Sequence, residues 1–414
     1  MLTSSRIPSG PRGPRRAHED TLLLVSSRER LTSRYGEQGF RAIQDSLKPF
    51  GFGLSERGVR LAVCLVDDAR SLSGWGAAPV KKITPASVKA VLDAVREKIS
   101  TRYRGARSQA AHSKAPVSVL ILGGHEVIPY FKLANPAPDS DAEVLSDNPY
   151  GSRPGAVTSE KCLLPDVPVG RMPDGDGRKL GLLTGQIELA TRAGKRREPP
   201  RGRSARGGES GDRALKYTAA VWQGASKEVV TNLGWKSALK VCPPLTYLRV
   251  KASWFDGKTL LYFNLHGSDK EPYWFGQMAD KYPTALSPGN VVNLSRGPNV
   301  VLTEACYGAV EAGKNCDTSM ALAFLTTGTR CFVGSTCVAY GAVAPPVSEA
   351  DLIALHFFRS LQRGMTVGRA LVMARAHLAA LAVSGQGYLD EDDKKTLLQF
   401  VLFGDPTLRP AWAF

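Results

Sequence analysis

Short apolar runs that alternate with segments of helical period constrain the fold of this chain more than any other feature. The runs are rich in Val, Ile and Leu and cover residues 61–66, 117–124, 167–170, 218–222, 260–267, 300–306 and 330–336. Strands of a parallel sheet that is covered on both faces are typically continuous apolar runs of this length. We therefore predict an α/β fold, a three-layer sandwich with a mostly parallel central sheet flanked by helices.

The segments between these runs carry readable helix signals. In residues 84–100 the apolar side chains recur on one helical face, after Thr84 at the N-cap and Pro85 at the first helical position. Further helices are expected over 178–193, about 318–327, 348–364 and 366–383. The helix at 348–364 is predicted to begin with a capping pair, Ser348 and Asp351.

Composition narrows the class of protein. The chain has 414 residues, 43% of them hydrophobic and 22% charged, which is typical of globular protein. No apolar run approaches the ~18 residues of a membrane span, and no apolar segment follows the basic first twenty residues as in a signal peptide. Seven scattered cysteines, with no CxxC pair, indicate a reducing cytoplasm and mostly buried thiols. We expect no metal, no other cofactor and no membrane partner.

The net charge of +16 raises the question of nucleic acid, but its distribution weakens that interpretation. Residues 214–414 carry 19 basic and 15 acidic side chains, so most of the excess lies in the first half. Part of it falls in the amino-terminal tail and in an Arg-rich segment at 195–213 that has almost no apolar residue. No nucleic-acid-binding motif accompanies the charge, and a nucleic-acid partner is not expected.

The same features divide the chain. We expect a disordered basic tail at 1–20, an amino-terminal extension or accessory part at 21–114, the first part of the α/β domain at 115–194, an exposed linker at 195–213 and the second part of the domain at 214–414.

Two predicted strands end in a reactive side chain next to glycine. His266 and Gly267 close one apolar run, and Cys306 closes the next long run, with Gly308 two residues on. Ligand sites of open α/β sheets form at the carboxyl ends of strands, so neighbouring strands would bring His266 and Cys306 together.

The pair suits nucleophilic catalysis. A thiolate is a strong nucleophile, and an imidazole can accept its proton and later protonate a leaving amine. The amides of Gly267 and Cys306 are the natural donors to an oxyanion. Each residue alone is more often structural; the two motifs together favour catalysis. His125 is the other candidate imidazole.

The His-Gly strand end followed by Glu-Ala-Cys-Tyr-Gly resembles the dyad of the caspase-like (clan CD) cysteine peptidases, most closely their gingipain and CHAT branch. Segments 120–130, 146–151, 168–173 and 403–410 resemble that branch in the same order, so the similarity spans about residues 115–410. The resemblance implies a caspase-like fold, protein or peptide substrates, and hydrolysis through an acyl-enzyme on Cys306.

The resemblance also implies a specificity residue. Asp147 stands in a Ser-Asp-x-x-Tyr-Gly segment where basic-specific gingipains bind the substrate's P1 arginine, and a carboxylate suits a guanidinium. The alternative is an Asx turn before Pro149. Asp141 and Glu143 are alternatives for orienting His266, and Trp274 is a candidate lining residue of the pocket, exposed in the loop after His266.

A pocket for arginine makes the linker a candidate processing site. Its exposed arginines are Arg196, Arg197, Arg201, Arg203 and Arg206. We hypothesise cleavage there, by the enzyme itself in trans or by an upstream activating protease, which releases a latent effector of a bacterial stress or defence cascade. A solvated insertion without regulatory role is the alternative for this segment. For the whole chain, the competing hypothesis is a catalytically weak docking module that binds a protein partner through its basic surface.

Overall fold

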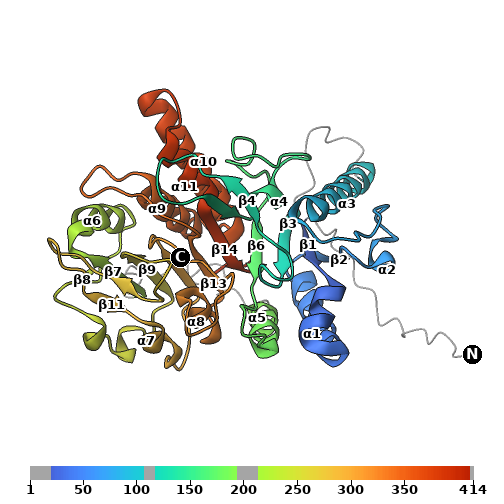
Figure 1. Ribbon diagram of the computed structural model, residues 1–414, viewed down its shortest axis with the longest axis horizontal. Coiled ribbons are helices and arrows are strands. Elements are labelled where there is room, and N and C mark those ends of the chain that lie inside the picture. Colours follow the sequence, from blue (N-terminus) through green and yellow to red (C-terminus); the bar gives the residue numbers. More distant parts are fainter. Residues whose placement is uncertain (1–19, 107–116, 194–212, 411–414) are drawn as a thin grey trace, which may run out of the picture.

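A ten-stranded sheet runs the length of the molecule in the computed structural model, which describes residues 20–106, 117–193 and 213–410 (Figure 1). The strand order is β2-β1-β3-β6-β14-β13-β12-β9-β7-β8. Every neighbouring pair is parallel except β13 with β14. The predicted α/β sandwich with a mostly parallel sheet is confirmed.

The strands of this sheet are β1 (Asp20–Ser26), β2 (Val59–Leu65), β3 (Val117–Leu122), β6 (Val169–Met172), β7 (Ala214–Ala219), β8 (Lys240–Cys242), β9 (Leu260–Asn264), β12 (Val300–Thr303), β13 (Cys331–Ser335) and β14 (Phe400–Gly404). Two hairpins lie outside it: β4 (Phe131–Ala134) with β5 (Glu143–Ser146), and β10 (Trp274–Phe275) with β11 (Thr284–Leu286).

Helices cover both faces of the sheet (Figure 1). One layer, below the sheet in this view, contains α1 (Arg28–Glu56), α5 (Leu180–Ala193), α7 (Pro288–Val292) and α8 (Met320–Thr326). The opposite layer contains α3 (Pro85–Ala106), α6 (Gln223–Asn232), α9 (Glu349–Gln362), α10 (Val367–Gln386) and α11 (Glu391–Gln399). Two short helices, α2 (Ala69–Leu72) and α4 (Asn148–Gly151), complete the set. The strands of the sheet centre are fully buried, since apolar layers cover both of their faces.

The amino-terminal extension lies in the same sheet. β1 pairs with β2 and β3, so these residues add two strands to the edge beyond β3. At the other end of the chain, β14 lies between β6 and β13, parallel to the first and antiparallel to the second. The sheet therefore joins the first and second parts of the chain through its last strand.

The capping pair predicted for α9 is found only in part. Ser348 is the N-cap of α9, but its side chain forms no cap hydrogen bond. Asp351 is buried, and its carboxylate accepts a hydrogen bond from the amide of Ala342 and interacts with the backbone of Ser348, which is half of the predicted pair. In addition, α10 is long and apolar enough by composition to cross a membrane, although 44% of that apolar window is buried in the protein, where α10 packs beside α9 (Figure 1).

Candidate active site

β9 and β12 are parallel neighbours in the sheet, paired from Leu260–Val300 to Phe263–Thr303. Each strand ends before the apolar run that contains it does. His266 therefore follows β9 by two residues, and Cys306 follows β12 by three. The two loops therefore leave the same edge of the sheet, at the carboxyl ends of adjacent strands, where open α/β folds place their ligands.

The two loops touch through their backbones. A Cβ atom on Gly267 would lie 1.9 Å from the carbonyl oxygen of Cys306, so only glycine permits this approach. The predicted proximity of the His266-Gly267 and Cys306 loops is thus observed directly.

Cys306 lies in a tight turn and is partly exposed. Tyr307 adopts a left-handed backbone (φ 56°), which is unusual for a residue with a side chain and typical of strained functional loops. The amide of Gly308 closes the turn onto the carbonyl of Ala305 at 3.0 Å. The hydroxyl of Tyr307 donates to Asp141 at 2.6 Å, which holds this turn against the segment that precedes β5.

Backbone amides surround the sulfur. The amide of Ala339 donates to Cys306 Sγ at 3.3 Å. Burial raises the pKa of the Cys306 thiol, and the amides of Ala339, Cys306 and Gly267 act against it by stabilising the thiolate. Amides that converge on the nucleophile are what an oxyanion hole requires, so Gly267 and Cys306 stay our prediction for its donors.

His266 is enclosed by neutral groups. Its Nε2 lies 2.7 Å from Oε1 of Gln277, in the loop of the β10–β11 hairpin. The ring centroid lies 4.1 Å from that of Trp222 and 5.2 Å from that of Tyr282. Burial lowers the pKa of His266 from its usual 6.5, and the bond to Gln277 partly offsets this. Sequence analysis missed Gln277 and Trp222, because neither residue type signals catalysis.

The carboxylates considered for orienting His266 are engaged elsewhere. Asp141 accepts from the amide of Val338 at 2.8 Å and from Nζ of Lys395 at 2.6 Å, besides its bond to Tyr307. Glu143 forms an ion pair with Lys132. The expectation that either acid orients His266 is therefore corrected in favour of Gln277.

Asp147 also has a different partner. It is only 4% exposed, and its two carboxylate oxygens accept from Nε and Nη2 of the buried Arg171 at 2.9 and 2.6 Å. A substrate guanidinium would have to displace Arg171 from this bidentate pair, which would leave a buried charge without its partner. The structure corrects the expectation that Asp147 receives a P1 arginine; it also shows no Asx cap at this residue, since the carboxylate makes no cap bond to α4.

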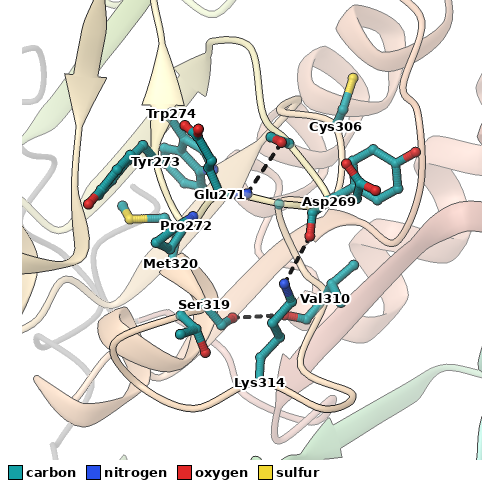
Figure 2. Close-up of a pocket in the computed structure, with 14 residues that line it drawn as sticks. Asp269, Glu271, Pro272, Tyr273, Trp274, Cys306, Val310, Lys314, Ser319 and Met320 are labelled. Carbon is teal, nitrogen blue, oxygen red and sulfur yellow. Dashed lines mark hydrogen bonds between the residues drawn. The ribbon is translucent and has the colours of Figure 1, made fainter.

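A small cavity of about 60 Å³ opens beside Cys306. Lys314 donates to the backbone oxygen of Asp269 across it, and the sulfur of Cys306 points away from Lys314 (Figure 2). Trp274 lines this cavity as expected, but it is only 2% exposed and packs on Phe263 and Phe324. It is a core residue with one edge at the cavity.

A second pair of acids lies at the same strand ends. Glu304, two residues before Cys306, is 6% exposed, and Asp351 at the start of α9 is fully buried. Burial, and then the charge of the neighbouring acid, raise the pKa of Glu304; burial raises that of Asp351 to about 6. Neither acid forms an ion pair with Lys or Arg within the described ranges of the chain.

Gly341 covers this acidic pair at the protein surface. Gly341 is exposed, and a Cβ atom there would lie 3.2 Å from Oδ2 of Asp351 and 3.8 Å from Oε2 of Glu304. Segment 339–342 links the sulfur to the acids. The amide of Ala339 donates to Cys306 Sγ, and the amide of Ala342 donates to the carboxylate of Asp351. The spacing of Glu304 from Cys306 was visible in the sequence; its pairing with Asp351 was not.

His125 does not share this site's chemistry. Its Nδ1 accepts from the amide of Tyr130 at 3.3 Å and its ring stacks on that tyrosine. It is a structural histidine. The five arginines proposed as processing sites (Arg196, Arg197, Arg201, Arg203 and Arg206) lie outside the described residues.

The fold is that of the caspase-like cysteine peptidases, and His266 and Cys306 stay the predicted catalytic dyad. Residues 213–411 match the family model described as peptidase family C25. No curated protein matches the sequence significantly.

Solved structures share the fold. The Arg-specific cysteine proteinase gingipain R (RgpB) superimposes with a TM-score of 0.55 at 16% identity, covering 95% of this chain and 78% of that chain. A complex of the pro- and mature domains of RgpB from Porphyromonas gingivalis gives 0.56 at 15% identity, covering 94% and 79%. A structure described only as a protease gives 0.60 at 17% identity, covering 94% and 78%.

Proposed function

We propose that this cysteine peptidase cleaves peptide bonds after basic residues, arginine preferred, and that Glu304 and Asp351 recognise the basic side chain. The observation that carries this proposal is a buried acidic pair, next to the nucleophile, that has no cationic partner in the described part of the chain.

The physical argument starts from the cost of burial. Two neighbouring buried carboxyl groups hold their protons more tightly than exposed ones because their charged forms are poorly solvated and repel each other. A guanidinium or ammonium group placed between them would restore the ionised forms and gain charge-assisted hydrogen bonds. The pair therefore has the chemistry to bind a basic side chain.

Position supports the same conclusion. The amide of Ala339 donates to the sulfur and that of Ala342 donates to Asp351, and these two amides, three residues apart, are separated by at most ~10 Å. An arginine side chain whose carbonyl is held at Cys306 can approach a site at this distance.

The reaction follows from the dyad. His266 accepts the thiol proton as the sulfur of Cys306 attacks the scissile carbonyl, and the amides of Gly267 and Cys306 receive the oxyanion. The imidazolium then protonates the leaving amine as the C–N bond breaks, which gives an acyl-enzyme. Water, deprotonated by His266, attacks the acyl carbon and returns the free thiol.

The experiment compares fluorogenic peptides that differ only at P1, with Arg, Lys, Ala or Asp. We expect Glu304→Gln and Asp351→Asn to lower kcat/KM on Arg and Lys peptides by roughly 100-fold relative to wild type, since a lost charge-assisted contact costs ~2–3 kcal/mol. Glu311→Gln is the matched control, a buried glutamate that accepts from the amide of His125 instead.

A readout without turnover accompanies this assay. Agmatine carries the guanidinium of arginine and should raise the Tm of the inactive Cys306→Ala protein, but not that of Cys306→Ala with Glu304→Gln. Equal losses on all four peptides, with no agmatine effect, would remove the pair from substrate recognition. No turnover by wild type, even after trypsin nicking of the linker, would favour the docking module.

We further propose that the enzyme is kept latent until the 195–213 linker is cut, and that it acts in the cytoplasm in a bacterial stress or defence response. The seven cysteines are free thiols, which supports a reducing compartment. In a similar fold, the mature domain of RgpB has been solved in complex with its pro-domain, which is compatible with such a latent form. Intact-mass analysis of active wild type beside Cys306→Ala tests the processing step: an active, uncut chain would overturn it.

A further inference from the structure

The orientation of the Gln277 amide is fixed by its own contacts. Its Nε2 donates to the carbonyl of Ala279 at 3.2 Å and to the hydroxyl of Tyr282 at 3.0 Å. The amide oxygen is therefore the atom that faces Nε2 of His266. Since an amide oxygen only accepts, the imidazole must carry its proton on Nε2, and the neutral ring then has its lone pair on Nδ1.

The backbone that carries Gln277 is held in place as firmly. Phe275 exchanges two backbone hydrogen bonds with His266, both 2.9 Å long, and the carbonyl of Gln277 accepts from the amide of Val221 at 3.1 Å. Gly276 lies so close to Cys242 that a Cβ atom would come within 2.3 Å of its carbonyl oxygen. The hairpin loop is thus anchored just before Gln277 and at Gln277 itself.

The remaining surroundings of the imidazole are uncharged. Trp222, the last residue of the 3-10 helix that follows β7, lies against the ring, and Tyr282 approaches it from the hairpin loop. The titratable groups on the elements around His266 are Tyr282, Asp280 and Lys281 in the hairpin loop, Asp269, Lys270 and Glu271 in the loop after His266, and Cys306 after β12. No carboxylate or cation of the described residues is among the causes that set the His266 pKa.

We propose that Gln277 is the positioning residue of the catalytic imidazole: it fixes the Nε2–H tautomer and so presents Nδ1 to Cys306. The proton of the thiol moves to Nδ1 while the S–C bond forms, and Nδ1–H then delivers that proton to the amine as the C–N bond breaks. The Nε2–H bond to Gln277 persists throughout. Because the partner is a neutral amide, the imidazolium gains less stabilisation than a carboxylate would supply.

This inference rests on the peptidase activity but not on its preference for basic residues. The first experiment therefore needs no turnover. The ¹⁵N shifts of His266 in the Cys306→Ala protein report which ring nitrogen is protonated, and we expect the Nε2–H form. Gln277→Leu should give a mixture of tautomers. Gln277→Glu should raise the His266 pKa by about one unit or more, since an adjacent carboxylate favours imidazolium.

The second experiment uses the active enzyme. Gln277→Leu should lower kcat by roughly 100-fold with little change in KM, because the base is present but wrongly oriented. Gln277→Glu should recover much of that loss above the new imidazole pKa, so that the acidic limb of the kcat/KM profile moves to higher pH. Tyr282→Phe should lower kcat a few-fold by freeing the amide.

Met278→Ala is the matched control, because Met278 is the next residue of the same loop and its side chain is 56% exposed. It should leave both readouts unchanged. A single Nε2–H tautomer and a wild-type kcat in Gln277→Leu would overturn the proposal. If instead the wild-type enzyme hydrolyses no peptide while the tautomer depends on Gln277 as described, the proposed function fails and the positioning role stands.

Discussion

The backbone of Gly267 lies directly against the carbonyl of Cys306: any Cβ atom at position 267 would be 1.9 Å from that oxygen. This contact joins the loop after β9 to the loop after β12 and fixes the relative position of base and nucleophile. It also predicts that the smallest possible side chain at 267 will disrupt the dyad.

Gly267→Ala should therefore lower kcat/KM by at least ~100-fold and unfolding free energy by about 1–3 kcal/mol, because the backbone of one loop must move. Peptide hydrolysis and thermal unfolding measure the two effects. Gly185→Ala in α5 is the control, since no atom lies within 4 Å of a Cβ atom there and alanine favours the helix. An active Gly267→Ala enzyme would contradict the close contact.

Asp147→Asn should damage the fold and not the specificity. Its removal leaves the buried guanidinium of Arg171 without its carboxylate, which costs about 3–5 kcal/mol in comparable buried pairs. We expect a lower Tm and equal losses of activity per folded molecule on every peptide. Asp45→Asn, from the exposed pair with Lys48, should change the Tm little. A loss confined to basic peptides, at unchanged Tm, would restore Asp147 as the P1 residue.

The pH dependence of Cys306 alkylation follows from the two shifted pKa values. Burial raises the pKa of the thiol above its usual 9 and lowers that of His266 below 6.5, so both groups are neutral near pH 7 in the free enzyme. The rate of alkylation by iodoacetamide should therefore climb steadily through pH 9. A flat rate between pH 5 and 8 would instead reveal a thiolate–imidazolium pair. Intact mass should show one adduct, because the other six cysteines are buried.

The contribution of Asp351 to the stability of the fold depends on pH. Its pKa is raised from 3.8 to about 6, chiefly by burial, so the folded state binds this proton more tightly than the unfolded state. Its contribution to stability is present below pH 3.8 and is lost as pH rises through about 6. The fall in Tm between pH 4 and 8 should thus be smaller in Asp351→Asn than in wild type. An equal fall in both proteins would show that folding does not raise the pKa of Asp351.

The apolar runs predicted the centre of the sheet because fully buried parallel strands leave a continuous local signal. β1 and β14 were missed, although Leu22–Val25 and Phe400–Phe403 are equally apolar, because one follows the basic tail and the other continues directly from α11. α1 was obscured by Pro49 and by Gly36, whose backbone is not helical.

The dyad was predictable for a related reason: a reactive side chain beside glycine at a strand end is a local pattern. The partners of these residues are not local. Arg171 binds Asp147 from a position 24 residues away in the sequence. Gln277 contacts His266 only because the β10–β11 hairpin folds back onto the end of β9. Because Arg171 is buried in a strand and has no water to solvate it, its charge needs an acidic partner, but the sequence does not say which acid that is.

The place of β14 has a consequence for any enzyme cut within 194–212. The carboxy-terminal strand is inserted beside β6, and Ser146 of the first part hydrogen-bonds to the carbonyl of Leu398 of the second. Severing the linker would break one covalent tether while leaving this interlock intact. The two products would copurify as a nicked heterodimer and separate only in denaturant. A gel run without denaturant would therefore not detect the cleavage.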